Sequence, residues 1–170
     1  IDTKNAYRTM LEQGIAPEKA LAEAQRISRD NARTPMQWDA SQHAGFTEGE
    51  PWINLCDNAA DINVTAALND TDSVFYTYQK LIALRKVEPV ITWGDYQDLL
   101  PDSPHLWCYQ REWQGQRLLV IANLSDTFQN WQPVQADGNW QVLMHNYAEV
   151  ASQPGDMTLR PFEAVWWLQK

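Results

Sequence analysis

The chain has 170 residues, of which 44% are hydrophobic and 21% charged, a composition that suits a globular protein with a real core. Its formal net charge of −9 argues against nucleic acids and anionic membranes as partners. No apolar run approaches the roughly 18 residues needed to cross a bilayer. From the charge and the lack of such a run, we expect neither nucleic acid nor membrane among its partners.

Three helices are predicted in the first half of the chain. Residues 2–13 carry apolar side chains at helical spacing, and Gly14 is placed to end this helix. Pro17 suits the first turn of a second helix, whose apolar stripe comprises Ala20, Leu21, Ala24 and Ile27. A stronger helix follows the capping candidates at 71–73 and ends before Pro89; its apolar face comprises Val74, Phe75, Tyr78, Leu81 and Ile82.

A long loop separates the second and third helices, since residues 28 to about 61 show no helical or strand period. Compact domains rarely hold more than about 12–15 structureless residues unless the loop has a function. This loop carries Trp38, Phe46 and Trp52 together with arginines. Aromatic rings cover the apolar faces of sugars, and guanidinium groups grip hydroxyls or anions. The loop therefore either contributes to a sugar site or plugs the end of a barrel, with Trp38 and Trp52 as a small core of its own.

The second half is predicted to form short strands, separated by turn-forming Gly, Pro and Asp residues, as in an antiparallel β-sandwich. The run 118–122 is continuously apolar, which indicates a strand covered on both faces. The domain boundary is expected near residues 87–89. The predicted strands are 90–93, 96–99, 106–113, 117–124, 128–132, 140–147, 157–159 and 163–169.

The cysteines and histidines give no sign of a metal or redox site. Cys56 and Cys108 are isolated and fit no such spacing, which favours two reduced thiols in a cytoplasmic protein. The histidines are scattered at positions 43, 105 and 145. We therefore expect no metal and no cofactor.

Residues 29–38 read Arg-Asp-Asn-Ala-Arg-Thr-Pro-Met-Gln-Trp, which resembles a hallmark of the oligo-1,6-glucosidase branch of the α-amylase family of glycoside hydrolases. The likeness continues in order along essentially the whole chain, in segments 43–46, 49–53, 62–64, 73–76, 80–85, 119–123, 145–147 and 159–161. It implies that the chain is the C-terminal part of a longer enzyme, which we call the parent. Residues 1–87 would be the last helical and loop portion of a (β/α)8 TIM barrel, including the long loop after its eighth strand. Residues 88–170 would form an antiparallel β-sandwich domain that packs against the barrel.

The resemblance also indicates which residues contact substrate. Arg33 matches the arginine that lines the subsite for the non-reducing glucose, so Arg33 is the one substrate-binding residue predicted here. The two catalytic carboxylates of the family belong to motifs on earlier strands that this sequence lacks, so no catalytic residue is assigned. The loop acids are expected to be solvated or salt-bridged; they are Asp30, Asp39, Glu48, Glu50 and Asp57. Arg29 and Asp30 are expected to fix the loop.

The implied activity is that of a retaining α-glucosidase. This chain would form one part of that enzyme and would be inactive on its own. Within the branch the closest likeness is to enzymes whose substrate is a small sugar phosphate, carried by segments 96–101, 106–109 and 162–170. Two alternatives stay open. One is a sister α-glucosidase acting on neutral sugars. The other is a non-catalytic sugar-binding module with an aromatic platform of Trp107, Trp113, Trp131 and Trp140, although core packing is the favoured role of these rings.

Overall fold

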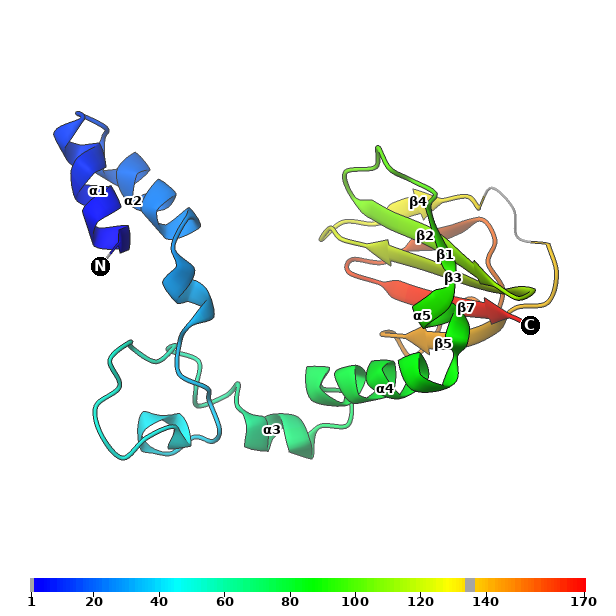
Figure 1. The fold of residues 1–170 in the computed structure, drawn as a ribbon, viewed down its shortest axis with the longest axis horizontal. Coiled ribbons are helices and arrows are strands. Elements are labelled where there is room, and N and C mark those ends of the chain that lie inside the picture. The colour runs from blue at the N-terminus through cyan, green and yellow to red at the C-terminus, as the bar shows by residue number, and fades with distance from the viewer. Residues whose placement is uncertain (1, 134–136) are drawn as a thin grey trace. The chain divides into compact units, whose positions relative to one another are not determined.

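The structure, a computed structural model, describes residues 2–133 and 137–170 (Figure 1). It divides into two compact units, one through Tyr78 and one from Gln79 to Lys170. The division lies inside helix α4 (Val74–Val87). A boundary at residues 87 and 88 concerns the parent enzyme and stays a prediction. None of the helices in the described part of the chain has the length and apolar character that crossing a bilayer requires.

The first unit begins with a helical hairpin, as the sequence predicts. Helix α1 (Asp2–Glu12) packs against α2 (Pro17–Arg26), which starts with proline in its first turn. Between them Gly14 takes a φ of +79° and donates its N–H to the carbonyl of Leu11. The Ile15 N–H reaches back to Met10 at 3.0 Å. This pair of bonds is a Schellman cap, which explains why the helix ends at this glycine.

The long loop contains little regular secondary structure. Two 3₁₀ turns occupy Arg29–Ala32 and Gln42–Gly45. A short helix that the sequence did not predict, α3 (Val64–Asn69), follows them. The Asn63 side chain accepts a hydrogen bond from the Ala66 N–H at 2.8 Å, so Asn63 is the N-cap of α3. The predicted third helix is confirmed as α4.

One predicted strand is wrong. Residues 90–93 lie in helix α5 (Pro89–Trp93), where Pro89 occupies the first turn and the Gly94 N–H bonds to the Val90 carbonyl at 3.1 Å. A short apolar run with β-branched residues fits a strand or a buried helical turn equally well. Val90 is fully buried against the following sheet, so its apolar character reflects packing and not strand formation.

The other seven predicted strands are confirmed, with ends that differ by at most a few residues. Five form one antiparallel sheet in the order β1-β2-β3-β7-β5, and two form a second antiparallel sheet, β4-β6. Their bounds are β1 (Asp95–Asp98), β2 (Leu106–Trp113), β3 (Gln116–Asn123), β4 (Gln129–Trp131), β5 (Gln141–His145), β6 (Met157–Leu159) and β7 (Ala164–Gln169).

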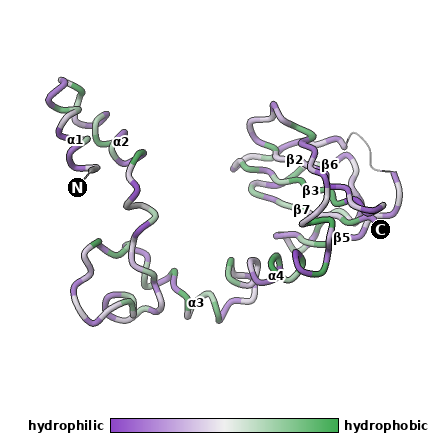
Figure 2. The backbone as a smooth tube through the Cα atoms, in the orientation of Figure 1, coloured by the Kyte–Doolittle hydropathy of each residue, from purple (hydrophilic) through white to green (hydrophobic). Residues whose placement is uncertain are grey.

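Strand β3 is buried on both faces, as its apolar run predicts. On one face Leu119 and Ile121 join a cluster that includes Trp131 of β4, Leu159 of β6 and Trp167 of β7. On the other face a second cluster forms beneath α5, made of Val90, Leu118, Val120 and Leu168. The core therefore has two layers, one between the two sheets and one between the larger sheet and α5. Figure 2 shows how hydrophobic and hydrophilic stretches alternate along this part of the backbone.

Candidate substrate-binding loop

Arg33 stands between two local constraints in the first unit. It directly follows the 3₁₀ turn at Arg29–Ala32 and precedes Thr34, whose backbone is restricted by Pro35. Pro35 is buried, whereas Arg33 is exposed in this chain. The turn and the buried proline therefore fix the course of the backbone around Arg33 and leave its guanidinium group at the surface of the unit.

The end of the same motif is tied to two other segments. The Gln37 carbonyl accepts a hydrogen bond from the Val64 N–H at 2.9 Å, and the Trp38 carbonyl accepts one from the Thr65 N–H at 3.0 Å. The Trp38 N–H donates to the Ala44 carbonyl at 2.8 Å. Because these bonds join the motif to the start of α3 and to the second 3₁₀ turn, the loop has a defined backbone despite its lack of regular structure.

Asp39 holds the second 3₁₀ turn. Its carboxylate accepts hydrogen bonds from the Ser41 hydroxyl and, at 2.9 Å, from the Ser41 N–H. The Ser41 side chain first, and its backbone N–H second, lower the pKa of Asp39 below its ordinary value. His43 and Ala44 both take a φ of +53°, and a Cβ on Gly45 would lie 2.9 Å from the Asp39 carboxylate. Asp39 is therefore a turn-forming acid, and the pair Asp39-x-Ser41 was the local signal for it.

The aromatic rings of the loop do not form a core of their own. Trp38 is 50% exposed and Trp52 is 84% exposed, so these two rings do not form the small core that belongs to the barrel-plug alternative. Phe46 is also exposed and borders an open hollow of about 470 Å³ next to Ser41 and His43. These rings and Arg33 give the loop the surface chemistry that sugar sites use: flat apolar faces and a planar donor.

No group of side chains in the described part of the loop is arranged as a metal site. In residues 2–133 and 137–170 no group of three or more His, Cys, Asp and Glu side chains is placed to hold a metal ion. The side chain of Asp30 lies outside what the structure describes. His43 contacts the Gln42 side chain, and His145 contacts the Tyr147 carbonyl. The prediction that the chain holds no catalytic residue stays a prediction.

The tryptophans of the second unit belong mainly to its core. Trp131 and Trp140 are buried, and Trp131 stacks on Trp167 with ring centroids 6.0 Å apart. Trp113 is half-buried. Only Trp107 of the proposed platform is exposed, and its Nε1 donates to the Tyr96 hydroxyl at 3.3 Å. A four-ring sugar platform is therefore not formed, and core packing, the favoured role, holds for two of its members.

Known proteins resemble the chain along its whole length. The chain is 61% identical over 170 residues to trehalose-6-phosphate hydrolase of Escherichia coli (strain K12), of which it covers 31%. It is 44% identical to an oligo-1,6-glucosidase of Heyndrickxia coagulans, of which it covers 30%. The crystal structure of trehalose-6-phosphate hydrolase from Bacillus licheniformis matches 99% of the chain with a TM-score of 0.91 and 38% identity, and 31% of that structure is covered.

The chain thus spans about a third of the length of these relatives. The family profile described as "Alpha amylase, catalytic domain" matches residues 3–94, which include the Arg33 motif, the long loop and helices α3 to α5. That match covers more than half of the chain. The chain belongs to the α-amylase family.

Proposed function

We propose that the chain is the C-terminal part of a retaining α-glucosidase that hydrolyses trehalose 6-phosphate to glucose and glucose 6-phosphate. The observation that carries this proposal is the difference in identity over the full chain: 61% to the trehalose-6-phosphate hydrolase of Escherichia coli against 44% to the oligo-1,6-glucosidase of Heyndrickxia coagulans. An α-glucosidase for neutral sugars, such as an oligo-1,6-glucosidase, is the second candidate, because that relative is also similar over the whole chain.

In this proposal residues 1–87 complete a (β/α)8 barrel and residues 88–170 form a β-sandwich that packs against it. The profile match to residues 3–94 and the two antiparallel sheets support this division. Helix α4 also supports the proposal of a barrel, since in this chain it exposes four apolar side chains to water: Val74, Phe75, Tyr78 and Ile82. The barrel is thus the predicted partner of this helix.

Arg33 is proposed to bind a sugar hydroxyl in the parent. Its guanidinium group carries a permanent charge and presents donors in a fixed plane, which suits a hydroxyl that must be held in one orientation. A retaining glycosidase also needs two carboxyl groups about 5–5.5 Å apart, one as nucleophile and one as acid and base. Both are proposed to come from the part of the parent outside this chain, so that the loop contributes binding and the barrel contributes the chemistry.

A cytoplasmic location is part of the proposal. It is supported by the two cysteines, which are free thiols, one exposed at Cys56 and one buried at Cys108. Free thiols persist most readily in a reducing compartment.

The substrate is tested by assaying the full-length parent on trehalose 6-phosphate and on isomaltose. We expect the larger kcat/KM for trehalose 6-phosphate. A larger value for isomaltose would replace the proposal with the neutral-sugar enzyme.

The 170-residue chain alone is expected to hydrolyse neither sugar, nor a chromogenic α-glucoside. Sugar binding by this chain without its parent would favour the non-catalytic module.

A further inference from the structure

A cavity of about 190 Å³ lies in the second unit, beside the edge strand β1. It is lined by residues from both sheets and from the segments that follow β1 and β4. On its floor Cys108, Leu119 and Trp131 are buried, whereas Gln97 and Gln132 are exposed. The cavity is therefore closed at its inner end and reaches the surface at its outer end.

The polar part of the lining consists of glutamine amides. Gln97 and Gln110 are paired across β1 and β2, and Gln132 follows β4 in the other sheet. Among the described residues that line the cavity, none has a charged side chain. An amide offers an oxygen that accepts hydrogen bonds and a nitrogen that donates two. Such a lining suits a neutral ligand whose groups both donate and accept, as hydroxyl groups do.

Two carboxylates hold these amides in place. The Gln110 Nε2 donates to the Glu112 carboxylate at 2.7 Å, and the Gln132 Nε2 donates to the Asp156 carboxylate at 3.4 Å. Each bond uses one N–H, so the amide oxygen and the second N–H give each glutamine further capacity to bind a ligand. Amides that are oriented in advance lose less freedom when a ligand binds.

A third carboxylate acts on the floor of the cavity. Burial first, and the negative charge of Asp98 second, raise the pKa of Cys108 to about 12, so this thiol is uncharged at neutral pH. Asp98, Glu112 and Asp156 thus place negative charge around an uncharged lining. An anion in the cavity would be repelled by these groups, whereas a neutral molecule would not.

The apolar walls and the size of the cavity narrow the choice of ligand. Leu99 and Leu100 line it together with Leu119 and Trp131. Aromatic and aliphatic side chains cover the C–H faces of a sugar ring. Pockets that enclose drug-sized ligands measure about 300–1,000 Å³, so a cavity of about 190 Å³ suits a single sugar ring better than a disaccharide.

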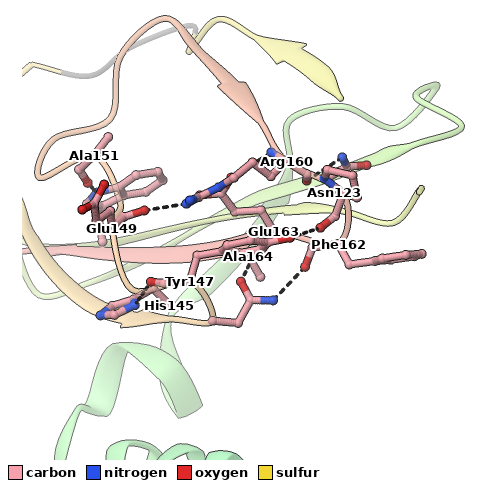
Figure 3. A network of polar contacts seen from close by, with 12 residues as sticks. Asn123, His145, Tyr147, Glu149, Ala151, Arg160, Phe162, Glu163 and Ala164 are labelled. Carbon is pink, nitrogen blue, oxygen red and sulfur yellow. Dashed lines mark hydrogen bonds and ion pairs between the residues drawn. The ribbon is translucent and has the colours of Figure 1, made fainter. Parts of the chain in front are cut away.

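The network around Arg160 and Glu163 is a polar cluster of a different kind in the same unit (Figure 3). The Arg160 Nη2 donates to the Glu163 Oε1 at 2.7 Å, and the Arg160 N–H donates to the same carboxylate at 2.8 Å. The Asn123 side-chain amide donates to the carbonyls of Thr127 and Arg160 at 2.7 and 2.9 Å. These bonds tie the segment before β7 to β3, so this network is structural, whereas the glutamines face an open cavity.

We propose that the cavity, called the glutamine cavity below, binds one neutral monosaccharide such as glucose. The hydroxyl groups of the sugar would bond to the amides, and its apolar face would lie against the leucines and Trp131. Glucose is also a product of the proposed reaction, so this ligand is present wherever the parent acts. The inference goes beyond the proposed function, because it adds a second sugar site in the second unit and requires no particular substrate of the parent.

Hydrogen exchange of the full-length parent, followed by mass spectrometry, tests the proposal and locates the binding. The reporters are two backbone amides at the cavity: Leu99, which donates to the Cys108 carbonyl at 2.8 Å, and Leu100, which donates to the Asp98 carboxylate at 3.0 Å. With a dissociation constant of about 1 mM, ordinary for so small a ligand, about 10 mM glucose should slow their exchange about 10-fold. Glucose 6-phosphate at the same concentration should leave their exchange unchanged, since it is an anion.

Glutamine variants of the parent supply the controls. Gln110→Met removes an amide at nearly constant side-chain length and should abolish the slowing by glucose. Gln97→Met, at an exposed position of β1, should weaken it and serves if Gln110→Met does not fold. Gln141→Met is the matched control, because Gln141 is exposed on β5 at the opposite edge of the sheet, and it should keep the full effect.

Three results would overturn the proposal. The first is unchanged exchange of the Leu99 and Leu100 amides in glucose, and the second is equal slowing by glucose 6-phosphate or by glycerol, which has no ring. The third is full slowing in the folded Gln110→Met and Gln97→Met variants. Binding of glucose at the active site would slow exchange in other segments, and the substrate assays are separate measurements, so failure of the proposed function would leave this test intact.

Discussion

The two units of the chain differ in how they bury apolar side chains. In the described residues through Tyr78, the buried apolar side chains are Pro35 and three alanines, Ala20, Ala24 and Ala44. From Gln79 onward, large residues such as Leu118, Ile121 and Trp167 fill two clusters on either side of one strand. The second unit thus has a core of its own, whereas the first has hydrogen-bonded turns and helices with little core beneath them.

The difference indicates where each unit obtains its stability. The loop is fixed by backbone bonds to Gln37 and Trp38, and these bonds are worth little net free energy in water. Its large apolar side chains, including Met36 and Trp52, face outward in this chain. The exposed apolar side chains of the first unit agree with the proposal that it completes a barrel. We expect the second unit to fold on its own core.

The largest expected effect is on the core of the second unit. Trp167→Ala should lower the free energy of unfolding by about 3–5 kcal/mol, because it removes a fully buried ring and leaves the Ala151 carbonyl without its donor. Trp52→Ala is the control and should change this free energy by less than about 0.5 kcal/mol, since the ring is exposed. Denaturant unfolding of the 170-residue chain, followed by circular dichroism, measures both. Similar losses in the two variants would contradict the division into a unit with a core and a unit without one.

A smaller effect is expected at Arg33, in the activity of the parent. Loss of a charge-assisted hydrogen bond to a sugar hydroxyl, worth roughly 1.5–3 kcal/mol, should lower kcat/KM about 10- to 100-fold in Arg33→Ala. Arg26→Ala is the control, because Arg26 is exposed and its ion pair with Glu23 spans one turn of α2. Its loss should cost little activity.

Thermal unfolding of the same parent variants separates binding from support of the loop. If Arg33 binds sugar, the midpoint should hold while kcat/KM falls. A loss of stability in step with activity would make Arg33 a structural residue of the loop. Normal kcat/KM in folded Arg33→Ala protein would remove the assignment altogether.

The second unit, which contains both sheets and is called the sheet unit below, was largely predictable from sequence because the patterns that indicate its strands and turns are local. Turn formers such as Gly115 end runs of β-branched and aromatic residues, and the bounds of β2 and β6 were predicted as observed. The segment that begins at Val90 was predicted as a strand but is helical, because burial and strand formation favour the same residue types. Helix α3 was missed because six residues are too few to show a period, although Asn63 was a visible cap.

The candidate site was less predictable. Arg33 came from a resemblance, and no periodicity or spacing in the loop points to it. The turn at His43 and Ala44 has left-handed backbone at two non-glycine residues, which no local sequence rule indicates. It is held by the Asp39 carboxylate through Ser41 and by the Trp38 N–H, which donates to the Ala44 carbonyl. The Trp38 carbonyl in turn accepts the N–H of Thr65, a residue far along the chain. Tertiary contacts therefore decide the geometry of the loop, whereas local propensity decides most of the sheet.

The ion pair between Arg160 and Glu163 predicts that the second unit loses stability at acid pH. The hydrogen bond from Arg160 lowers the pKa of Glu163 below its ordinary value of 4.5. A lowered pKa stabilises the fold fully above the ordinary value, and this contribution is lost as the pH falls through the folded-state pKa. Glu163→Gln should cost about 1.5–3 kcal/mol at pH 7 and less in acid. Unfolding titrations from pH 7 to pH 3 measure this convergence, and parallel curves for the two proteins would show that the carboxylate charge has no such role.

The smallest effect is expected at the cap of α3, and it tests whether the two units are independent. Asn63→Ala removes the acceptor of the Ala66 N–H and should destabilise α3 by about 0.5–2 kcal/mol. Hydrogen exchange of the α3 amides in the 170-residue chain should then accelerate about 2- to 30-fold, while the unfolding midpoint of the sheet unit stays unchanged. Asn69→Ala, at the exposed end of the same helix, is the matched control and should leave both readouts near their original values. Because the core of the second unit includes no side chain from α3, a shift of the sheet midpoint in Asn63→Ala would mean that the two units unfold together.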